Sequence, residues 1–386
     1  MKKKFLAMLM TGAMVVASLT GCTVGGSGSS DSNSNTTTTT DTNTTESTTE
    51  NAATTETASA DDGYVSGESS LKGQNVRVVI GSTSTSGDSY MVADIVTRYL
   101  AEEMGFNGKV DAIGNAAALD EIANAKGDGK TVMMFHDMTF MSVLFGAVDE
   151  KYSLENMTVG PRIGQNPGAC FGAAAESPYA SLSEITQYLK DNPDETVAFN
   201  IEAGGTSHIA FSAYYLDVLD KEGEAVASRI KAIVGGTTAE KLQRLWDRNA
   251  DVIYGDTSAF EQYTQDGVDA QLKMTMFGSG STVNGVEITS MADEGVEFNG
   301  KPFDFAKDFA MYFPKDMNAS VLAEYEAAMK RVTENPEFQA EMAKLYYSTL
   351  SADEVAVAAS QQFIYDKREM CKELIAKSPD LDSLTN

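Results

Sequence analysis

Residues 76–88 read Val-Arg-Val-Val-Ile-Gly-Ser-Thr-Ser-Thr-Ser-Gly-Asp, and this stretch contains the unit from which the fold is predicted. The β-branched run from Val76 to Ile80 predicts a strand, the Gly/Ser/Thr segment predicts a loop, and Asp88 is the expected N-cap of a helix. The next segment has apolar residues with helical spacing, at Val92, Ile95, Val96, Tyr99 and Leu100. Such a stripe is typical of a helix that lies on a sheet.

The same order of strand, loop and helix recurs along the chain. Further strands are predicted at 110–113, 131–135, 196–201, 230–234 and 251–254, and capping boxes at 181–184 and 237–240 open helices. This alternation predicts parallel-rich sheets with helices on both faces. The C-terminal region is predicted to be helical, at 320–333, at 336–348 and from a capping box at 351–354.

The N-terminus has the parts of a secretory signal: three lysines, an apolar stretch from Phe5 to about Ala17, and small residues before Cys22. The apolar stretch is too short to span a bilayer. Leu-Thr-Gly-Cys at 19–22 matches the bacterial lipobox, so residues 1–21 are predicted to be removed and Cys22 to be diacylated. A free thiol after a signal peptide is the alternative. Two acyl chains would hold the protein durably at a membrane.

Residues 22–71 consist mostly of Ser, Thr, Asn, Gly and acidic residues, with no Lys or Arg before Lys72. This composition predicts a disordered linker, because it cannot bury enough apolar surface to offset the ordering entropy. About fifty residues of flexible coil span roughly 40 Å. The remaining segment, 72–386, is long enough for two domains and is expected to be monomeric.

The chain is strongly acidic, with a formal net charge of −27, of which 72–386 carries −22. Such a charge gives no electrostatic reason to bind nucleic acid or anionic lipid. An anionic ligand would be captured by local donors against the overall field. Cys170 and Cys371 lie far apart in sequence and form no disulfide framework, so both are expected to be free, with a disulfide between them as the alternative.

The Gly/Ser/Thr loops lie where ligands bind in such sheets, outside the carboxyl ends of the strands. Helix N-termini there present free N–H groups, and hydroxyl side chains add donors. Several such ends facing one cleft would bind a carboxylate with little help from Arg or Lys. However, any strand-to-helix turn has a similar composition, so a single loop is weak evidence.

Enzyme motifs are missing. The chain has no Gly-x-Ser-x-Gly, no Cys-x-x-Cys and only two histidines, His136 and His208, so no catalytic centre, metal or cofactor is predicted. Residues 127–131 superficially resemble a phosphate-binding loop but precede a strand, so they are interpreted as a tight turn. His208 could cap or pack its helix or face a ligand, and Asp256 could cap a helix or accept a hydrogen bond from a ligand.

The order of these loops resembles the Bug or TctC-like family, the substrate-binding proteins of tripartite tricarboxylate transporters, from about Val76 to Tyr347. The most telling segments are the loop ending at Gly87-Asp88, the run from Asn115 to Ala118 with 128–131 after it, the segment 204–210, Val234 to Thr237, 308–314 and 335–338. The first loop is Ser/Thr-rich where the family usually has Gly-Gly and Pro, and the second has alanines where glycines are usual.

This resemblance implies an α/β, two-lobed, class II periplasmic-binding fold with a hinge and a ligand cleft. Lobe 1 would comprise 72–168 and 306–386, and lobe 2 would comprise 169–305, with crossings near 164–171 and 301–309. Carried over by position, the ligand-binding residues are Ser84, Thr85, Ser86, Gly87, Asn115, Ala116, Thr206, Ser207, His208, Gly236, Thr237 and Asp256.

The implied function is capture of a di- or tricarboxylate and its delivery to membrane permease subunits of a tripartite transporter. The protein would be anchored by lipid on the extracytoplasmic face of the cell membrane, and the acidic Ser/Thr linker favours a Gram-positive-type surface. An amino-acid or aromatic-carboxylate ligand is an alternative, and Asp256 would favour an amine if it points into the cleft. A sensing receptor without transport and a hydrolase are further alternatives.

Overall fold

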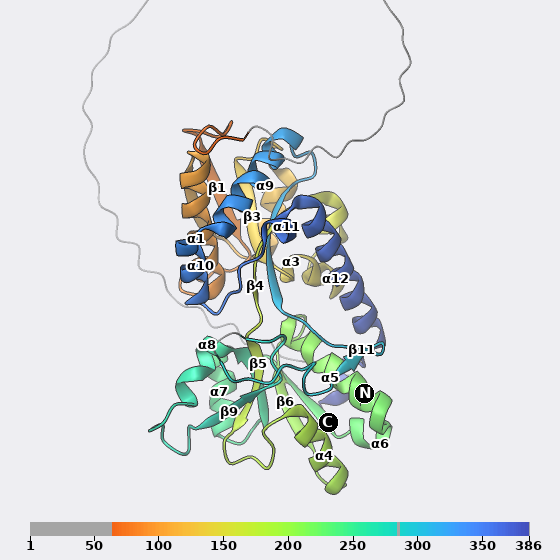
Figure 1. Ribbon diagram of the computed structural model, residues 1–386. Coiled ribbons are helices and arrows are strands. Elements are labelled where there is room, and N and C mark those ends of the chain that lie inside the picture. Colours follow the sequence, from red (N-terminus) through yellow and green to blue (C-terminus); the bar gives the residue numbers. More distant parts are fainter. Residues whose placement is uncertain (1–63, 284–285, 386) are drawn as a thin grey trace, which may run out of the picture. The chain divides into compact units, whose positions relative to one another are not determined.

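The structure is a computed structural model that describes residues 64–283 and 286–385 (Figure 1). The predicted signal peptide, Cys22 and nearly all of the predicted linker at 22–71 lie outside the described residues. Within the described residues no helix is both long and apolar enough to cross a membrane.

The first lobe contains a five-stranded sheet with the order β2-β1-β3-β12-β4. Strands β2 (Asn107–Ala112), β1 (Asn75–Ile80) and β3 (Thr131–His136) are parallel. Strand β12 (Lys307–Pro314) runs antiparallel to β3 and also pairs antiparallel with β4 (Met157–Asn166). The carboxyl ends of β1 and β3 therefore meet the start of β12 at one edge of the sheet.

Helices cover both faces of this sheet, as the alternation of its side chains requires. Val78 and Ile80 of β1 pack in the cluster that includes α1 (Asp88–Met104), α9 (Ala319–Glu334) and α10 (Pro336–Ala343). Val79 points the other way, into the cluster with α2 (Asn115–Asn124), α3 (Met138–Leu144) and α12 (Val357–Lys377). Figure 1 shows α1 and α10 on one side of the sheet and α3 and α12 on the other.

The second lobe repeats this plan in a sheet with the order β7-β6-β8-β5-β9. Strands β7 (Ile230–Val234), β6 (Val197–Ile201) and β8 (Val252–Asp256) are parallel, while β5 (Ala169–Ala174) is antiparallel to β8 and to β9 (Met274–Phe277). Its helices are α4 (Leu182–Asp191), α5 (Thr206–Glu222), α6 (Glu224–Ala227), α7 (Thr238–Trp246) and α8 (Thr257–Phe260). A short hairpin of β10 (Glu297–Phe298) and β11 (Lys301–Pro302) follows.

The chain passes between the two sheets twice. It leaves the first sheet at the end of β4, crosses at 167–168 and enters the second sheet in β5, and it returns through 303–306 into β12. At the first crossing the Thr257 amide donates to the carbonyl of Gly168 at 2.8 Å. A Cβ on Gly168 would lie only 2.8 Å from Thr257 Oγ1, so the close approach requires glycine.

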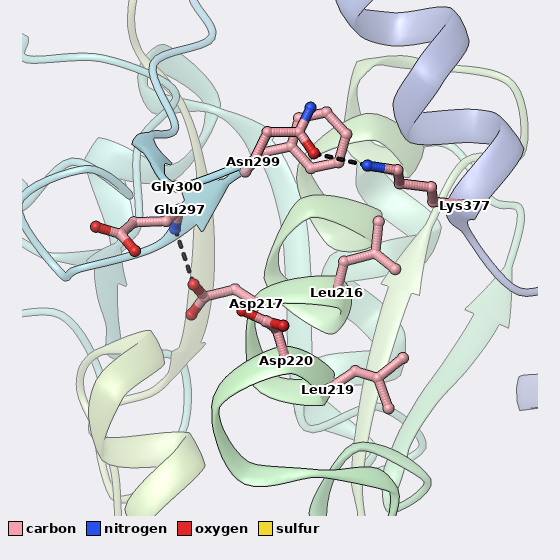
Figure 2. Close-up of a pocket in the computed structure, with 9 residues that line it drawn as sticks. Leu216, Asp217, Leu219, Asp220, Glu297, Asn299, Gly300 and Lys377 are labelled. Atoms are coloured by element: carbon pink, nitrogen blue, oxygen red, sulfur yellow. Dashed lines mark hydrogen bonds between the residues drawn. The ribbon is translucent and has the colours of Figure 1, made fainter.

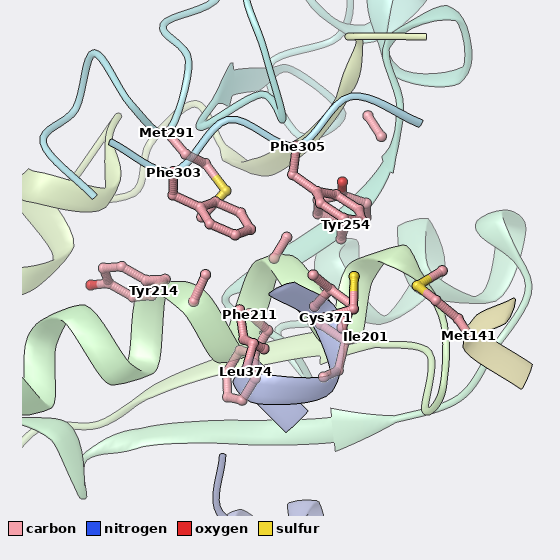
Figure 3. Packing of buried hydrophobic residues seen from close by; sticks show 14 of the residues in the cluster. Met141, Ile201, Phe211, Tyr214, Tyr254, Met291, Phe303, Phe305, Cys371 and Leu374 are labelled. Atoms are coloured by element: carbon pink, nitrogen blue, oxygen red, sulfur yellow. The ribbon is translucent and has the colours of Figure 1, made fainter. Parts of the chain in front are cut away.

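The C-terminal helix α12 contacts elements of both lobes. It packs on β4, and it also packs on α5, while the 3₁₀ turn at Leu381–Leu384 packs against β7. Lys377 donates to Asn299 Oδ1 of the β10–β11 hairpin at 2.7 Å (Figure 2). Cys371 and Leu374 belong to one buried cluster with Phe211 of α5 (Figure 3). Residues 306–386 are predicted to lie in the first lobe, and the structure packs the end of this segment against the second.

Two five-stranded α/β sheets confirm the predicted fold class. The predicted capping boxes at Thr237 and Ser351 are both present, and Ser181 accepts a hydrogen bond from the Glu184 amide. Cys170 and Cys371 are free and buried, as expected.

Three local predictions were wrong. The N-cap of α1 is Gly87, and Asp88 is the first residue inside the helix. The helix that begins at Pro336 ends at Ala343, five residues early. The Ser351 box opens only the one-turn α11 (Ala352–Val355), because Ala356 has the extended ψ of 136°, and the long helix begins after it.

Candidate functional site

A cavity of about 200 Å³ lies where the carboxyl ends of strands from both sheets come together. Its lining residues come from both lobes, and Lys307 of β12 is one of those from the first lobe. The lining residues are Asp88, His136, Met138, Ala169, Glu202, Gly205, Thr206, Ser207, Thr238, Lys241, Tyr254, Gly255, Asp256 and Lys307. We take this cavity as the candidate ligand site, because strand carboxyl ends and helix N-termini are where α/β sheets bind small molecules.

Lys307 forms ion pairs with two of the acidic residues that line the cavity. Its Nζ is 2.5 Å from Asp88 Oδ2 and 3.2 Å from Asp256 Oδ1, and its side chain is only 8% exposed. Asp88 begins α1, where the helix dipole also favours a negative charge. Asp256 ends β8 in the other lobe, so Lys307 joins acids from the two lobes.

Asp88 is fixed by a second donor, since the Tyr347 hydroxyl donates to the same Oδ2 at 2.7 Å. Burial by itself would raise the pKa of Asp88, but the ammonium of Lys307 and the Tyr347 hydroxyl hold this pKa well below its usual range. Burial and the neighbouring Asp88 raise the pKa of Tyr347 well above its usual value, although Lys307 opposes them. Asp88 is thus a carboxylate and Tyr347 a neutral donor at neutral pH.

A second ion pair lies on the other lobe. Lys241 of α7 donates to Glu202 Oε1 and to the carbonyl of Tyr254, both at 2.8 Å, and its side chain is 3% exposed. Glu202 follows β6 and Asp256 ends β8, which are adjacent parallel strands. Parallel strands end at the same edge of a sheet, and Glu202 and Asp256 both line the cavity.

Two helix N-termini reach the cavity. Thr206 is the first residue of α5 and Thr238 the first of α7. The α5 helix is entered through Gly204, whose φ of 75° is the left-handed conformation that glycine accepts readily. Ser207 Oγ accepts from the Glu202 amide at 2.9 Å and so closes this loop. The exposed amides of these first turns are available to an anion.

The two histidines differ in position. His136 lines the cavity, and burial together with nearby Lys307 lowers its pKa to about 3. Its Nδ1 accepts from the Met138 amide at 3.3 Å, so a neutral ring carries its proton on Nε2. His208 is not among the lining residues. Its Nδ1 accepts from the Gly204 amide at 3.2 Å, and burial lowers its pKa to about 4.

Of the twelve residues predicted to bind ligand, the structure brings three to the cavity: Thr206, Ser207 and Asp256. The first predicted loop, 84–87, turns on itself through bonds such as Ser86 N to Ser84 Oγ at 3.3 Å, and its Ser and Thr side chains are exposed. These loop residues do not line the cavity.

The remaining predicted residues also lie outside the lining set. Asn115 donates to Ser142 Oγ at 2.9 Å, and Ala116 is exposed beside it. Thr237 caps α7, and Gly236 precedes it with a φ of 104°. Thr237 is nevertheless the immediate neighbour of the lining residue Thr238.

Sequence reasoning missed most of the charged groups. Asp88 was interpreted only as a helix cap, and Glu202, Lys241 and Lys307 were not singled out. The signal for Lys307 was its position, because Lys307 and Asp308 open the strand segment 307–314, whose other residues are apolar and in which all eight residues are buried. A lysine in such a run must find a carboxylate partner.

Other hollows have different surroundings. One of about 400 Å³ beside the β10–β11 hairpin is lined by Asp217, Asp220, Glu297 and Lys377, among others (Figure 2). Two of its charged groups already have partners on their own helices, since Asp217 pairs with Lys221 at 2.7 Å and Lys377 pairs with Glu373 at 2.8 Å. Within 64–283 and 286–385, no group of three or more His, Cys, Asp or Glu side chains is arranged to hold a metal ion.

The fold is that of two-lobed periplasmic solute-binding proteins. The periplasmic binding protein BugD superposes with a TM-score of 0.57 at 18% identity, covering 78% of this chain and 97% of that one. MatC from Rhodopseudomonas palustris, solved with bound malate, superposes with a TM-score of 0.59 at 14% identity, covering 78% of this chain and 99% of that one. A TctC solute binding protein from Polaromonas, solved without ligand, superposes with a TM-score of 0.60 at 15% identity, covering 78% of this chain and 98% of that one.

No protein-family model matches the chain, and no curated protein matches it in sequence. The likeness at 14–18% identity therefore concerns the fold, and it confirms the predicted class II periplasmic-binding architecture.

Proposed function

We propose that this chain is an extracytoplasmic solute-binding protein without catalytic activity, which captures a small organic carboxylate of the di- or tricarboxylate type. The observation that carries the proposal is the cavity between the lobes, which is lined by the N-termini of two helices, α5 and α7. These N-termini supply backbone N–H donors in a confined space, which is what recognition of a small carboxylate requires.

The fold supports the same role. Solved proteins of this fold include MatC with malate and an R. palustris protein with adipate. Both ligands are small dicarboxylates, in line with the class expected from the sequence. The bound solute would then be delivered to the membrane subunits of a tripartite-type transporter.

The anchor is part of the proposal. The lipobox at 19–22 supports acylation of Cys22 and a position on the outer face of a cell membrane, with a Gram-positive-type surface favoured by the acidic Ser/Thr linker. Changing Cys22 to alanine should move the protein from the membrane fraction to the soluble fraction. Retention of the Cys22→Ala protein in the membrane fraction would contradict the anchor.

A thermal-shift screen of the full-length protein against organic acids, amino acids and sugars tests the binding function. A ligand specific for the folded state stabilises by about 2.7 kcal/mol at a hundredfold excess over Kd. Thr206→Phe should abolish the shift by filling the cavity. Thr196→Phe is the matched control, because Thr196 is exposed and precedes β6 at the end remote from Glu202. No shift with any carboxylate would contradict the proposed function.

A further inference from the structure

The charged side chains that line the cavity do not balance. Three are acidic, Asp88, Glu202 and Asp256, and two are basic, Lys241 and Lys307. His136 adds no charge, because its pKa of about 3 keeps it neutral. The lining of the cavity thus has a surplus of one negative charge, which is unfavourable for a ligand that carries only carboxylates.

The two lysines are already occupied by acceptors on the protein. Lys307 donates to Asp88 and Asp256, and Lys241 donates to Glu202 and to a backbone carbonyl. Neither ammonium is a free counter-ion for a ligand carboxylate. A carboxylate that enters the cavity has to rely on the remaining protons and on the N-termini of α5 and α7.

The available acceptors lie on the second lobe. Asp256 uses only Oδ1 and Glu202 only Oε1 in the hydrogen bonds of the described residues, which leaves Asp256 Oδ2 and Glu202 Oε2 without a partner. Both side chains keep contact with the open space of the cavity, at 39% and 54% exposed. Since both line the same cavity of about 200 Å³, one small cation bound there can approach both.

We propose that the captured carboxylate also carries an ammonium group, which is received by the free oxygens of Asp256 and Glu202 while the ligand carboxylate faces the N-termini of α5 and α7. The ammonium supplies the positive charge that the lining lacks and has three protons for the two free oxygens. This inference rests on the proposed function and narrows its ligand class, so that a plain dicarboxylate of the same skeleton is rejected.

Isothermal titration calorimetry on the full-length protein with matched pairs tests the inference. The probes are aspartate against succinate and glutamate against glutarate, which differ only by the ammonium. The ammonium-bearing member should bind at least tenfold more tightly in at least one pair. Succinate or glutarate binding as tightly as its amino counterpart would overturn the inference and leave the proposed function standing.

Variants locate the selectivity. Asp256→Asn and Glu202→Gln should each reduce the ratio of affinities within a pair, whereas Asp304→Asn should not, because Asp304 is exposed and lines a different hollow. Circular dichroism of each variant checks the fold. An unchanged ratio in both cavity variants would overturn the inference, and absence of binding by every carboxylate would overturn the proposed function with it.

Discussion

The imidazole of His208 stacks on the ring of Phe145, with 4.7 Å between the ring centroids and 22° between the planes. Phe145 follows α3 in the first lobe, and His208 lies in the first turn of α5 in the second. The same ring of Phe145 lies against Gly204, whose amide donates to His208. The stack therefore connects the first lobe to the loop that positions Thr206 at the cavity.

Replacing Phe145 with alanine should loosen this loop. An aromatic pair contributes about 0.5–1.5 kcal/mol, so amide exchange across 202–209 should become roughly 2- to 10-fold faster. Hydrogen–deuterium exchange by mass spectrometry measures it. Tyr263→Ala is the control, since it removes an edge-to-face aromatic contact with Trp246 inside the second lobe. Equal exchange of 202–209 in the two variants would show that the Phe145 stack does not order the loop.

A buried charge network lies directly behind the cavity. Lys367 of α12 donates to Asp137 Oδ2 at 2.8 Å, to Asp308 Oδ2 at 2.7 Å and to the carbonyl of Ala306 at 2.6 Å. Arg162 donates to the other oxygen of Asp308 at 2.6 Å. Burial raises the pKa of Asp137 to about 6 even though Lys367 opposes the shift. The network fixes α12 to the start of β12, where Lys307 enters the cavity.

Lys367→Met should therefore destabilise the fold strongly. Loss of one partner leaves Asp137 as a buried carboxylate without its counter-ion, which costs about 3–5 kcal/mol. Lys372→Met on the same helix is the matched control, because Lys372 is 66% exposed and its contact with Glu369 is 3.8 Å long. Denaturant unfolding gives both free energies. A loss in Lys367→Met no greater than that in Lys372→Met would contradict this account.

The fold was predictable from local patterns. In strands such as 230–234 four of the five residues are apolar, and glycine or polar residues bound the strand. The capping boxes at Thr237 and Ser351 formed as their spacing predicts. These features depend on residues a few positions apart. The one-turn α11 was missed because the break at Ala356 involves neither Gly nor Pro, so no local residue marks it.

The site was less predictable because its groups are distant in sequence. Asp88 and Lys307 are 219 positions apart, and no local pattern indicates that they meet. Their contact depends on β12 returning from the second lobe into the first sheet beside β3. Asp256 and Thr206 could be predicted to lie at the cavity because Asp256 ends a strand and Thr206 begins a helix at the expected edge of the sheet. Lys241 lies in α7 and Glu202 directly follows β6. Both belong to segments that the sequence did indicate, but glycines and hydroxyl side chains were chosen there instead.

The cysteines allow a count of free thiols. Burial raises the pKa of both Cys170 and Cys371 to about 12, so neither should react with Ellman's reagent in the folded protein. Protein isolated from membranes should show no reactive thiol when native and two after unfolding in guanidinium, provided that Cys22 is acylated. Cys22→Ala protein, which should also give two, is the control. A third thiol in the unfolded wild-type protein would contradict the lipobox prediction.

His136 should make the stability fall on acidification. Its folded-state pKa of about 3 lies below the usual value of 6.5, because burial and Lys307 disfavour the imidazolium. A depressed pKa contributes stability that is complete above pH 6.5 and is lost as the pH falls towards 3. Between pH 7 and pH 5 the loss from His136 should be about 2 kcal/mol.

The His136→Asn variant isolates this contribution. Asparagine keeps an acceptor for the Met138 amide but does not titrate, so the variant should lose about 2 kcal/mol less than the wild type between pH 7 and pH 5. The comparison is needed because the pKa of Asp137 is raised to about 6, so its contribution to the stability of the protein has the opposite sign and grows as the pH falls. Urea unfolding at the two pH values gives the difference. Parallel losses in the two proteins would mean that His136 is already hydrated or charged in the folded state.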